Sequence, residues 1–239
     1  QATYTDGTSG TPPASSSSIG SATFDAAGSK NVSFGTITFT KAGTYQYQVH
    51  ETTQSGAGWT CDDENETVTV EVSATSDGIL SATVTTSASI TNSYAAAPVV
   101  VDTDASPLIE KSVSGVGFGT KEFDFEVEPD AVTYSDGTTG TSPAPEQSTA
   151  SLSFDAAGSK SVDFGDITFV KAGTYTYTVR ETTPSGDGWT CDTADKSVSV
   201  MVQDDGKGAL RLVGISMATI DNSYAAAGSF DTASASAVT

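Results

Sequence analysis

The chain has 239 residues, enough for one large domain or two ordinary ones. Ten Lys and Arg against thirty Asp and Glu give a net charge of -20. Such a field repels nucleic acid and anionic membranes, so neither is an expected partner. Gly, Ser, Thr, Ala and Val dominate, and helix-favouring runs are missing, which predicts an all-β protein with many turns.

Alternating apolar and polar residues predict eight strands in the second half of the chain. We expect them near residues 108–113, 122–128, 150–154, 161–169, 174–181, 196–202, 209–215 and 218–224. Residues 135–147 are rich in Gly, Thr, Ser and Pro and are predicted to form a long surface loop. Residues 204–208 carry hairpin-turn chemistry. Short strands with frequent turns indicate a β-sandwich.

An internal repeat relates the two halves of the chain, with a constant offset that aligns Tyr4 with Tyr134. Three matching pairs of segments show it: Phe24–Lys30 and Phe154–Lys160, Gly58–Asp62 and Gly188–Asp192, Asn92–Ala97 and Asn222–Ala227. The same strands are therefore expected in the first copy from Ser21 onward. Counterparts of residues 108–130 would lie before Gln1, so the first copy is expected to lack its first strand.

The repeat sets the expected domain boundaries. The first domain is predicted over residues 1–94, a linker over 95–106, the second domain over 107–227, and a linker or tail over 228–239. This layout suggests a fragment of a longer tandem array, with the missing strand located upstream. A strand donated by another chain is the alternative.

One strand of each copy carries an inward carboxylate. In residues 174–181, Tyr175, Tyr177, Val179 and Glu181 share one parity, and the apolar members mark the inward face. Glu51 holds the same place in the first copy. A carboxylate on the core side of a strand is costly unless it is protonated, paired or hydrogen-bonded.

The first and last strands of the second copy add two more inward polar residues. Lys111 shares a face with Ile109 and Val113. Asn222 shares a face with Ile220 and Tyr224, and Asn92 is its counterpart in the first copy. The second domain is therefore predicted to hold a Lys, a Glu and an Asn together in its interior.

Such a trio can form a covalent bond. Burial pushes Lys towards the neutral amine, which is a nucleophile, and pushes Glu towards the protonated acid. The amine of Lys111 can attack the carboxamide carbon of Asn222 and release ammonia, leaving an isopeptide bond. Glu181 would polarise the carbonyl group and transfer protons.

The ordered set resembles the isopeptide-linkage domain of Gram-positive backbone pilins, of the streptococcal T-antigen type. It consists of a first-strand Lys, then Tyr-x-Tyr-x-Val-x-Glu, then Gly-Trp-Thr, then Asn-x-Tyr, and it covers residues 108–224 and, without its start, residues 2–94. The resemblance implies two tandem immunoglobulin-like β-sandwiches and assigns the three roles to Lys111, Glu181 and Asn222. Two departures stand out: Cys follows Gly-Trp-Thr where Tyr is expected, and the first copy keeps Glu51 and Asn92 without a first-strand Lys.

The resemblance implies a structural stalk of a bacterial surface pilus or fibrous adhesin, extracellular and attached to the cell wall. Its expected partners are further repeats or pilin subunits of the same fibre. No cofactor, no metal and no turnover enzyme activity are expected beyond a single self-crosslinking event. The alternative is a ligand-binding adhesin module that contacts a host protein or glycan through loops such as residues 135–147. Near-identical loops in both copies favour the stalk.

Simpler interpretations compete for each residue. Taken singly, Lys111 would more often snorkel at an edge, Glu181 reach solvent and Asn222 cap a turn, but the three together favour the bond. Lys30 and Lys160 are weaker alternative amine donors. The acidic run 62–66 lacks calcium-loop spacing and is predicted to be a solvated loop. Cys61 and Cys191, at equivalent places next to Trp, are predicted to be small buried hydrophobes rather than a disulfide.

Overall fold

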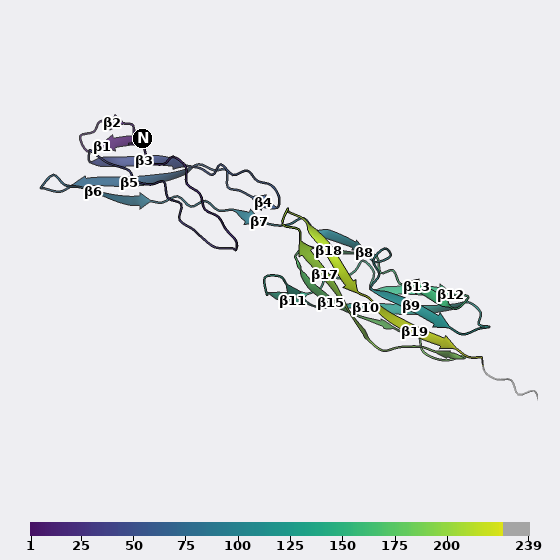
Figure 1. Cartoon of the computed structure of the whole chain (residues 1–239). Helices are drawn as coiled ribbons and strands as arrows, with labels where there is room; N and C mark the ends of the chain where they lie inside the picture. Colours follow the sequence, from purple (N-terminus) through teal and green to yellow (C-terminus); the bar gives the residue numbers. More distant parts are fainter. Residues whose placement is uncertain (227–239) are drawn as a thin grey trace, which may run out of the picture. The chain divides into compact units, whose positions relative to one another are not determined.

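A computed structural model describes residues 1–226 of the chain. Every regular element in that range is a β-strand (Figure 1), so the predicted all-β class is confirmed. No helix within the described range could cross a membrane. The chain divides into two compact units, with Gln1–Ser55 and Trp59–Ser93 in unit 1, and Gly56–Gly58 and the chain from Tyr94 onward in unit 2. The predicted tail, residues 228–239, lies outside the described residues.

Unit 2 is a β-sandwich built from strands of both halves of its sequence. One sheet has the order β11-β10-β15-β17-β18, with β12 also paired to β10, and a second has the order β13-β9-β19-β16. The first sheet contains β10 (Lys121–Tyr134), β11 (Thr139–Thr141), β12 (Thr149–Phe154), β15 (Gly173–Glu181), β17 (Lys196–Asp204) and β18 (Leu210–Ser216). The second contains β9 (Ile109–Ser114), β13 (Gly158–Ser161), β16 (Trp189–Thr190) and β19 (Ala218–Tyr224).

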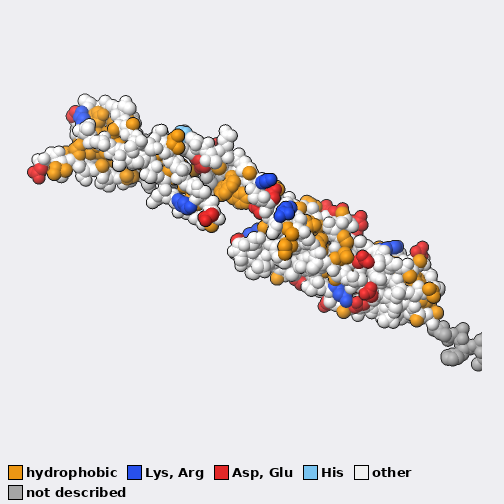
Figure 2. Space-filling view, viewed as in Figure 1, with side chains coloured by type: hydrophobic (Ala, Val, Ile, Leu, Met, Phe, Trp, Pro, Cys, Tyr) orange, Lys and Arg blue, Asp and Glu red, His pale blue; other side chains and the backbone are white. Residues whose placement is uncertain are grey.

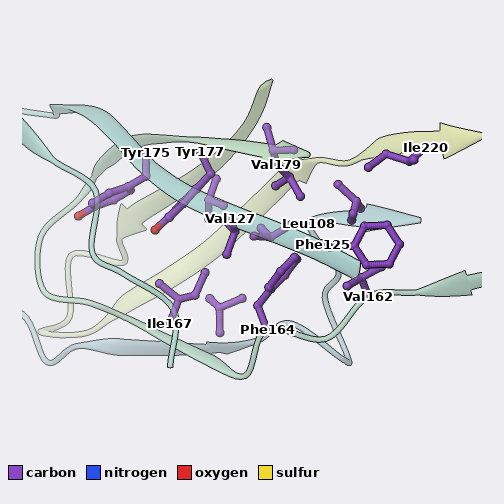
Figure 3. Packing of buried hydrophobic residues seen from close by; sticks show 14 of the residues in the cluster. Leu108, Phe125, Val127, Val162, Phe164, Ile167, Tyr175, Tyr177, Val179 and Ile220 are labelled. Carbon is purple, nitrogen blue, oxygen red and sulfur yellow. The ribbon is translucent and has the colours of Figure 1, made fainter. Parts of the chain in front are cut away.

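The side chains that alternation in the sequence predicted to face inward are the ones that the sandwich buries. Strand β15 is buried at every second residue from Gly173 to Glu181, and its Tyr175, Tyr177 and Val179 face the interior. Figure 3 shows these three side chains in one row above Ile167 and Phe164. Strand β10 buries Phe123, Phe125 and Val127 by the same rule. Period-two patterning thus fixes which face of each strand meets the core.

Three segments of unit 2 differ from the sequence prediction. The single strand expected over residues 161–169 is two short strands, β13 and β14 (Asp166–Phe169), which pair with different partners. The predicted loop 135–147 contains β11, and Tyr177 donates a hydrogen bond to the carbonyl oxygen of Pro143. The segment expected to be a linker contains β8 (Val99–Asp102), which pairs with β14. Its Val99, Val100 and Val101 give it strand propensity that the linker interpretation overlooked.

Unit 1 forms fewer strands than unit 2. Its main sheet has the order β2-β1-β3-β5-β6, and β4 pairs separately with β7. The elements are β1 (Ala2–Tyr4), β2 (Ser9–Gly10), β3 (Gly43–Val49), β4 (Trp59–Thr60), β5 (Glu66–Ala74), β6 (Leu80–Thr86) and β7 (Ser93–Tyr94). Its buried hydrophobic cluster has four members: Ala2, Tyr45, Val70 and Val72. The prediction that the strand pattern repeats from Ser21 onward is wrong for residues 21–42, which contain no strand.

The difference between the units has a physical reason in strand pairing. In unit 2, β12 pairs with β10, β13 with β9, and β14 with β8. The positions equivalent to β8, β9 and the paired part of β10 fall before residue 1 under the repeat offset. Segments 19–24, 28–31 and 36–39 therefore have no such strand to pair with among residues 1–226, and an unpaired strand leaves its backbone groups unsatisfied.

The face seen in Figure 2 carries its acidic residues in dispersed positions. Red Asp and Glu side chains are scattered there among white backbone and other side chains rather than gathered in one place. No group of three or more His, Cys, Asp or Glu within residues 1–226 is placed to hold a metal ion. In the acidic run, Asp62 instead accepts hydrogen bonds from the backbone N–H groups of Glu64 and Thr91.

Candidate functional site

The first and last strands of the unit 2 sheet lie next to each other. Strands β9 and β19 lie side by side (Figure 1) and pair in parallel. In this pairing Lys111 stands opposite Ile220. Asn222 stands opposite Val113, two residues further along. Because side chains alternate between faces with a period of two, Lys111 and Asn222 project from the same face of neighbouring strands.

Glu181 reaches this pair from the facing sheet, at the end of β15. Its Oε2 accepts a hydrogen bond from Nζ of Lys111 at 2.7 Å, and its Oε1 accepts one from Nδ2 of Asn222 at 2.8 Å. The exposed fractions of Lys111, Glu181 and Asn222 are 0%, 1% and 3%. One buried carboxylate therefore holds the amine and the carboxamide side by side, as the strand parities predicted.

The carbonyl oxygen of the Asn222 carboxamide contacts the backbone of a loop. The N–H of Asp192 donates to Oδ1 of Asn222 at 2.8 Å. This contact fixes the orientation of the amide, because a backbone donor must face the oxygen and leaves the NH₂ group to face Glu181. No sequence pattern predicts this contact, since a main-chain contact depends on the path of the loop and not on a side-chain type.

An aromatic cluster surrounds the three side chains. Nζ of Lys111 lies 4.9 Å from the ring centroid of Phe123. Phe123 packs edge-on against Trp189, with ring centroids 5.1 Å apart, and Trp189 contacts both Phe118 and Tyr224. These rings cover the site with apolar surface, so water is kept away from the polar groups inside it.

Burial changes the acid–base behaviour of the amine. Loss of hydration lowers the pKa of Lys111, while its hydrogen bond to Glu181 and the negative charge of that carboxylate act in the opposite direction. The net lowering increases the share of neutral amine over that of an exposed lysine. No buried side-chain nitrogen or oxygen among the described residues lacks a hydrogen-bond partner. The charged and polar groups of the site are thus mutually satisfied.

Unit 1 keeps the carboxylate, the carboxamide and the backbone N–H in the same arrangement, without the lysine. Nδ2 of Asn92 donates to Oε1 of Glu51 at 3.1 Å, and the N–H of Asp62 donates to Oδ1 of Asn92 at 3.0 Å. Asn92 is exposed, and Trp59 is 45% exposed where its counterpart Trp189 is 7% exposed. No lysine occupies the position of Lys111 in this unit, because that strand has no counterpart within residues 1–239.

The alternative amine donors lie elsewhere. Lys160 is exposed on β13, where its backbone stands opposite Lys111, and its Nζ donates to the carbonyl oxygen of Ser153 at 2.7 Å. Lys30 makes the equivalent contact with Thr23 in unit 1. Neither lysine contacts an asparagine of the two sites through these bonds, so Lys111 is the amine that the fold brings to Asn222.

The two cysteines are free thiols, and each is partly buried. Burial raises the pKa of Cys191 from 9.0 to about 11, and the nearby negative charge of Glu181 raises it further in the same direction. The folded state therefore keeps a thiol proton that the unfolded state loses between pH 9.0 and about pH 11. The contribution of Cys191 to stability is complete below this window and decreases as the pH rises through it.

This shift predicts slow alkylation of Cys191. At pH 9.0 we expect iodoacetamide to modify Cys191 in the folded chain on the order of 50-fold more slowly than in guanidinium-unfolded chain, because thiolate is the reactive form. Peptide mapping of timed samples measures the two rates. Equal rates in folded and unfolded chain, with unit 2 still folded by circular dichroism, would contradict the burial and charge argument.

Comparison with known proteins gives one family and a set of pilin structures. The family model for the Spy0128-like isopeptide containing domain, FctA, matches residues 2–95 and 108–225. The T-13 major pilin of Streptococcus pyogenes is 18% identical, with 81% of this chain and 72% of that chain covered and a TM-score of 0.22. The T3.2 major pilin of the same organism is 18% identical, covering 78% and 69%, with a TM-score of 0.24.

A further major pilin structure from Streptococcus pyogenes is 20% identical to this chain. It covers 80% of this chain and 73% of its own, with a TM-score of 0.23. No curated protein matches the chain. The two segments of the family match coincide with the two sequence repeats, and each contains one of the Glu–Asn pairs described above.

Proposed function

Because this chain belongs to the family of Spy0128-like isopeptide containing domains, we propose that it is a structural shaft segment of a bacterial surface pilus. Its second unit is held closed by a bond between Lys111 and Asn222. The observation that carries this proposal is the buried hydrogen-bonded line from Lys111 through Glu181 to Asn222, which joins the first and last strands of the sheet.

The bond forms by attack of the neutral amine of Lys111 on Cγ of Asn222. Glu181 accepts a proton from Nζ through one oxygen and delivers a proton to Nδ2 through the other, since its two oxygens already contact those two atoms. The new bond joins Nζ to Cγ, the bond from Cγ to Nδ2 breaks, and ammonia leaves. The reaction occurs once per unit, so the chain is its own substrate and not a turnover enzyme.

The proposed bond suits a shaft because of where it lies. Tension enters unit 2 at its two ends; β19 is its last strand, and β9 is the second strand from the other end, after β8. A covalent tie between β9 and β19 carries the force directly, so the hydrogen bonds of the sheets are not peeled apart. Extracellular placement and attachment to a cell wall, with further pilin subunits as partners, follow from this proposed role.

The ligand-binding alternative has less support within unit 2. Residues 135–147, its proposed contact loop, are held by the unit itself: the N–H groups of Glu146 and Gln147 donate to the carbonyl oxygens of Asp166 and Phe164. The hydroxyl of Ser142 donates to Ala131, and Ser142 is buried. A loop fixed in this way presents little free backbone for a host protein or glycan.

Intact-mass spectrometry tests the bond. The chain of residues 1–239 should weigh one ammonia less than its sequence mass, about 17 Da, because only unit 2 places an amine against its Glu–Asn pair. Lys111→Met and Asn222→Ala should each restore the sequence mass. Lys160→Met, which removes the exposed lysine opposite Lys111, is the matched control and should keep the deficit. An unmodified mass for the parent chain would end the proposal.

We also propose that Asn92 and Glu51 in unit 1 form the acceptor half of an equivalent bond. A synthetic peptide with the sequence of residues 99–130 supplies the strands that unit 1 lacks within this chain, including the lysine of β9. Mixing it with the chain should give a covalent adduct lighter than the sum of the two masses by one ammonia. Asn92→Ala in the chain, or Lys111→Met in the peptide, should abolish the adduct. A parent mixture that gives no adduct while unit 2 has its own bond would contradict the acceptor role.

A further inference from the structure

In unit 2 the carboxylate of Glu181 contacts both the amine and the reacting carboxamide, but it does not contact the oxygen that gains charge. Attack on Cγ of Asn222 converts its carbonyl oxygen, Oδ1, into an oxyanion. The carboxylate of Glu181 contacts Nδ2 and so cannot stabilise that oxygen in this geometry. The group that does contact Oδ1 is the backbone N–H of Asp192, at 2.8 Å.

We infer that the backbone N–H of Asp192 is the oxyanion donor of the self-crosslinking reaction. This inference rests on the proposed function and adds a catalytic group that is not a side chain. A pre-positioned donor next to a developing negative charge lowers the barrier to acyl transfer, and in a site closed to water it acts more strongly than it would in solvent.

The loop that carries this N–H is held in place by its own hydrogen bonds. Gly186 and Trp189 exchange two backbone bonds, of 3.0 and 2.8 Å, and the N–H of Cys191 donates to the hydroxyl of Ser185 at 2.9 Å. Gly188 has φ +87°, and a Cβ at its position would lie 2.6 Å from the carbonyl oxygen of Ala225. Glycine is therefore required for the close approach of this loop to the end of β19.

The side chain of Asp192 fixes the same peptide from the other side. Its Oδ1 accepts a hydrogen bond from the N–H of Ala194 at 3.1 Å, and its Oδ2 forms an ion pair with Lys196 at 2.7 Å. The carboxylate thus turns away from Asn222, and the N–H turns towards it. A fixed donor of this kind needs little reorganisation when the charge develops.

Unit 1 independently indicates that the loop itself positions the Asp N–H against the Asn carbonyl oxygen. There the N–H of Asp62 donates to Oδ1 of Asn92 at 3.0 Å, although Asn92 is exposed and no lysine is present. Cys61 again donates its N–H to Ser55, at 2.9 Å. The donor is therefore set by the Ser-Gly-x-Gly-Trp-Thr-Cys-Asp segment itself and does not depend on a filled site.

The test removes this one N–H. In cell-free synthesis of the whole chain, followed by intact mass at timed intervals, Asp192→Pro should slow the loss of ammonia on the order of 100-fold, the usual effect of deleting one oxyanion donor. Thr193→Pro places the same ring in the same exposed loop but keeps the N–H of residue 192. It should react within about threefold of the parent chain, because the donor is retained.

A second variant separates catalysis from folding. Incorporation of the α-hydroxy acid counterpart of aspartate at position 192 replaces the N–H with an oxygen atom and keeps the side chain with its contacts to Ala194 and Lys196. It should show the same slowing as Asp192→Pro while near-ultraviolet circular dichroism stays that of the parent chain. Crosslinking of this ester variant at the parent rate would overturn the inference and leave the proposed function intact. A parent chain that never loses ammonia would instead remove the proposed function and this inference together.

Discussion

Pulled between its ends in a force spectrometer, unit 2 should give no unfolding step from the residues enclosed by the proposed bond. Roughly 110 residues lie between Lys111 and Asn222, and at about 3.5 Å each they would add on the order of 380 Å if released. The proposed bond would prevent that release because it would connect β9 directly to β19, and all of these residues lie between the two linked side chains. The extension trace of the parent chain should therefore lack a step of this size.

Asn222→Ala removes the bond and should restore the step. The parallel strands β9 and β19 are then held only by hydrogen bonds and packing, and they separate under load. Asp221→Ala is the matched control, since Asp221 is the exposed neighbour on the same strand and leaves the reacting groups in place. The shaft role would be refuted by a step of this size in the parent chain or in Asp221→Ala.

Loss of Glu181 should destabilise unit 2 more than loss of the bond alone. Asn222→Ala removes a crosslink that closes a loop of roughly 110 residues, a loss of about 4 to 5 kcal/mol in the chain-entropy account. Glu181→Ala prevents the same bond and also leaves the fully buried Lys111 without its carboxylate partner. Breaking a buried ion pair in this way costs about 3 to 5 kcal/mol, so Glu181→Ala should be the less stable variant by about that amount.

Denaturant unfolding measures the difference, with Trp189 fluorescence followed in a Trp59→Phe background. The two variants should unfold at clearly different denaturant concentrations, with Glu181→Ala first. Glu128→Ala removes a carboxylate that is 54% exposed in its ion pair with Arg180, and it should change the free energy of unfolding by less than about 1 kcal/mol. Equal stability of Glu181→Ala and Asn222→Ala would show that Lys111 does not depend on the carboxylate.

The parts of the fold that follow from strand parity could be predicted from the sequence. Alternation along β9, β15 and β19 placed Lys111, Glu181 and Asn222 on inward faces, and the structure buries all three. Parity is reliable here because a shift of one residue would move every apolar side chain of the strand to the wrong face. The three residues could be found without knowing which strands are neighbours.

The parts of the fold that depend on pairing partners and loop paths could not be predicted from the sequence. Residues 36–39 of unit 1 have the sequence of a strand and form none, because the partner that β14 finds in β8 has no counterpart there. The contact between the N–H of Asp192 and Asn222 is invisible in the sequence, since every residue but proline carries that group. Local pattern therefore predicts orientation, and only tertiary contact decides whether a strand forms.

The parallel pairing of β9 with β19 has one more consequence for unit 2. Two neighbouring strands that run the same way place the start of the first and the end of the last at opposite poles of the sandwich. The polypeptide enters β9 at one pole and leaves β19 at the other. Another copy of the gene segment can thus be joined at either terminus during evolution, and the interior of the existing module stays undisturbed.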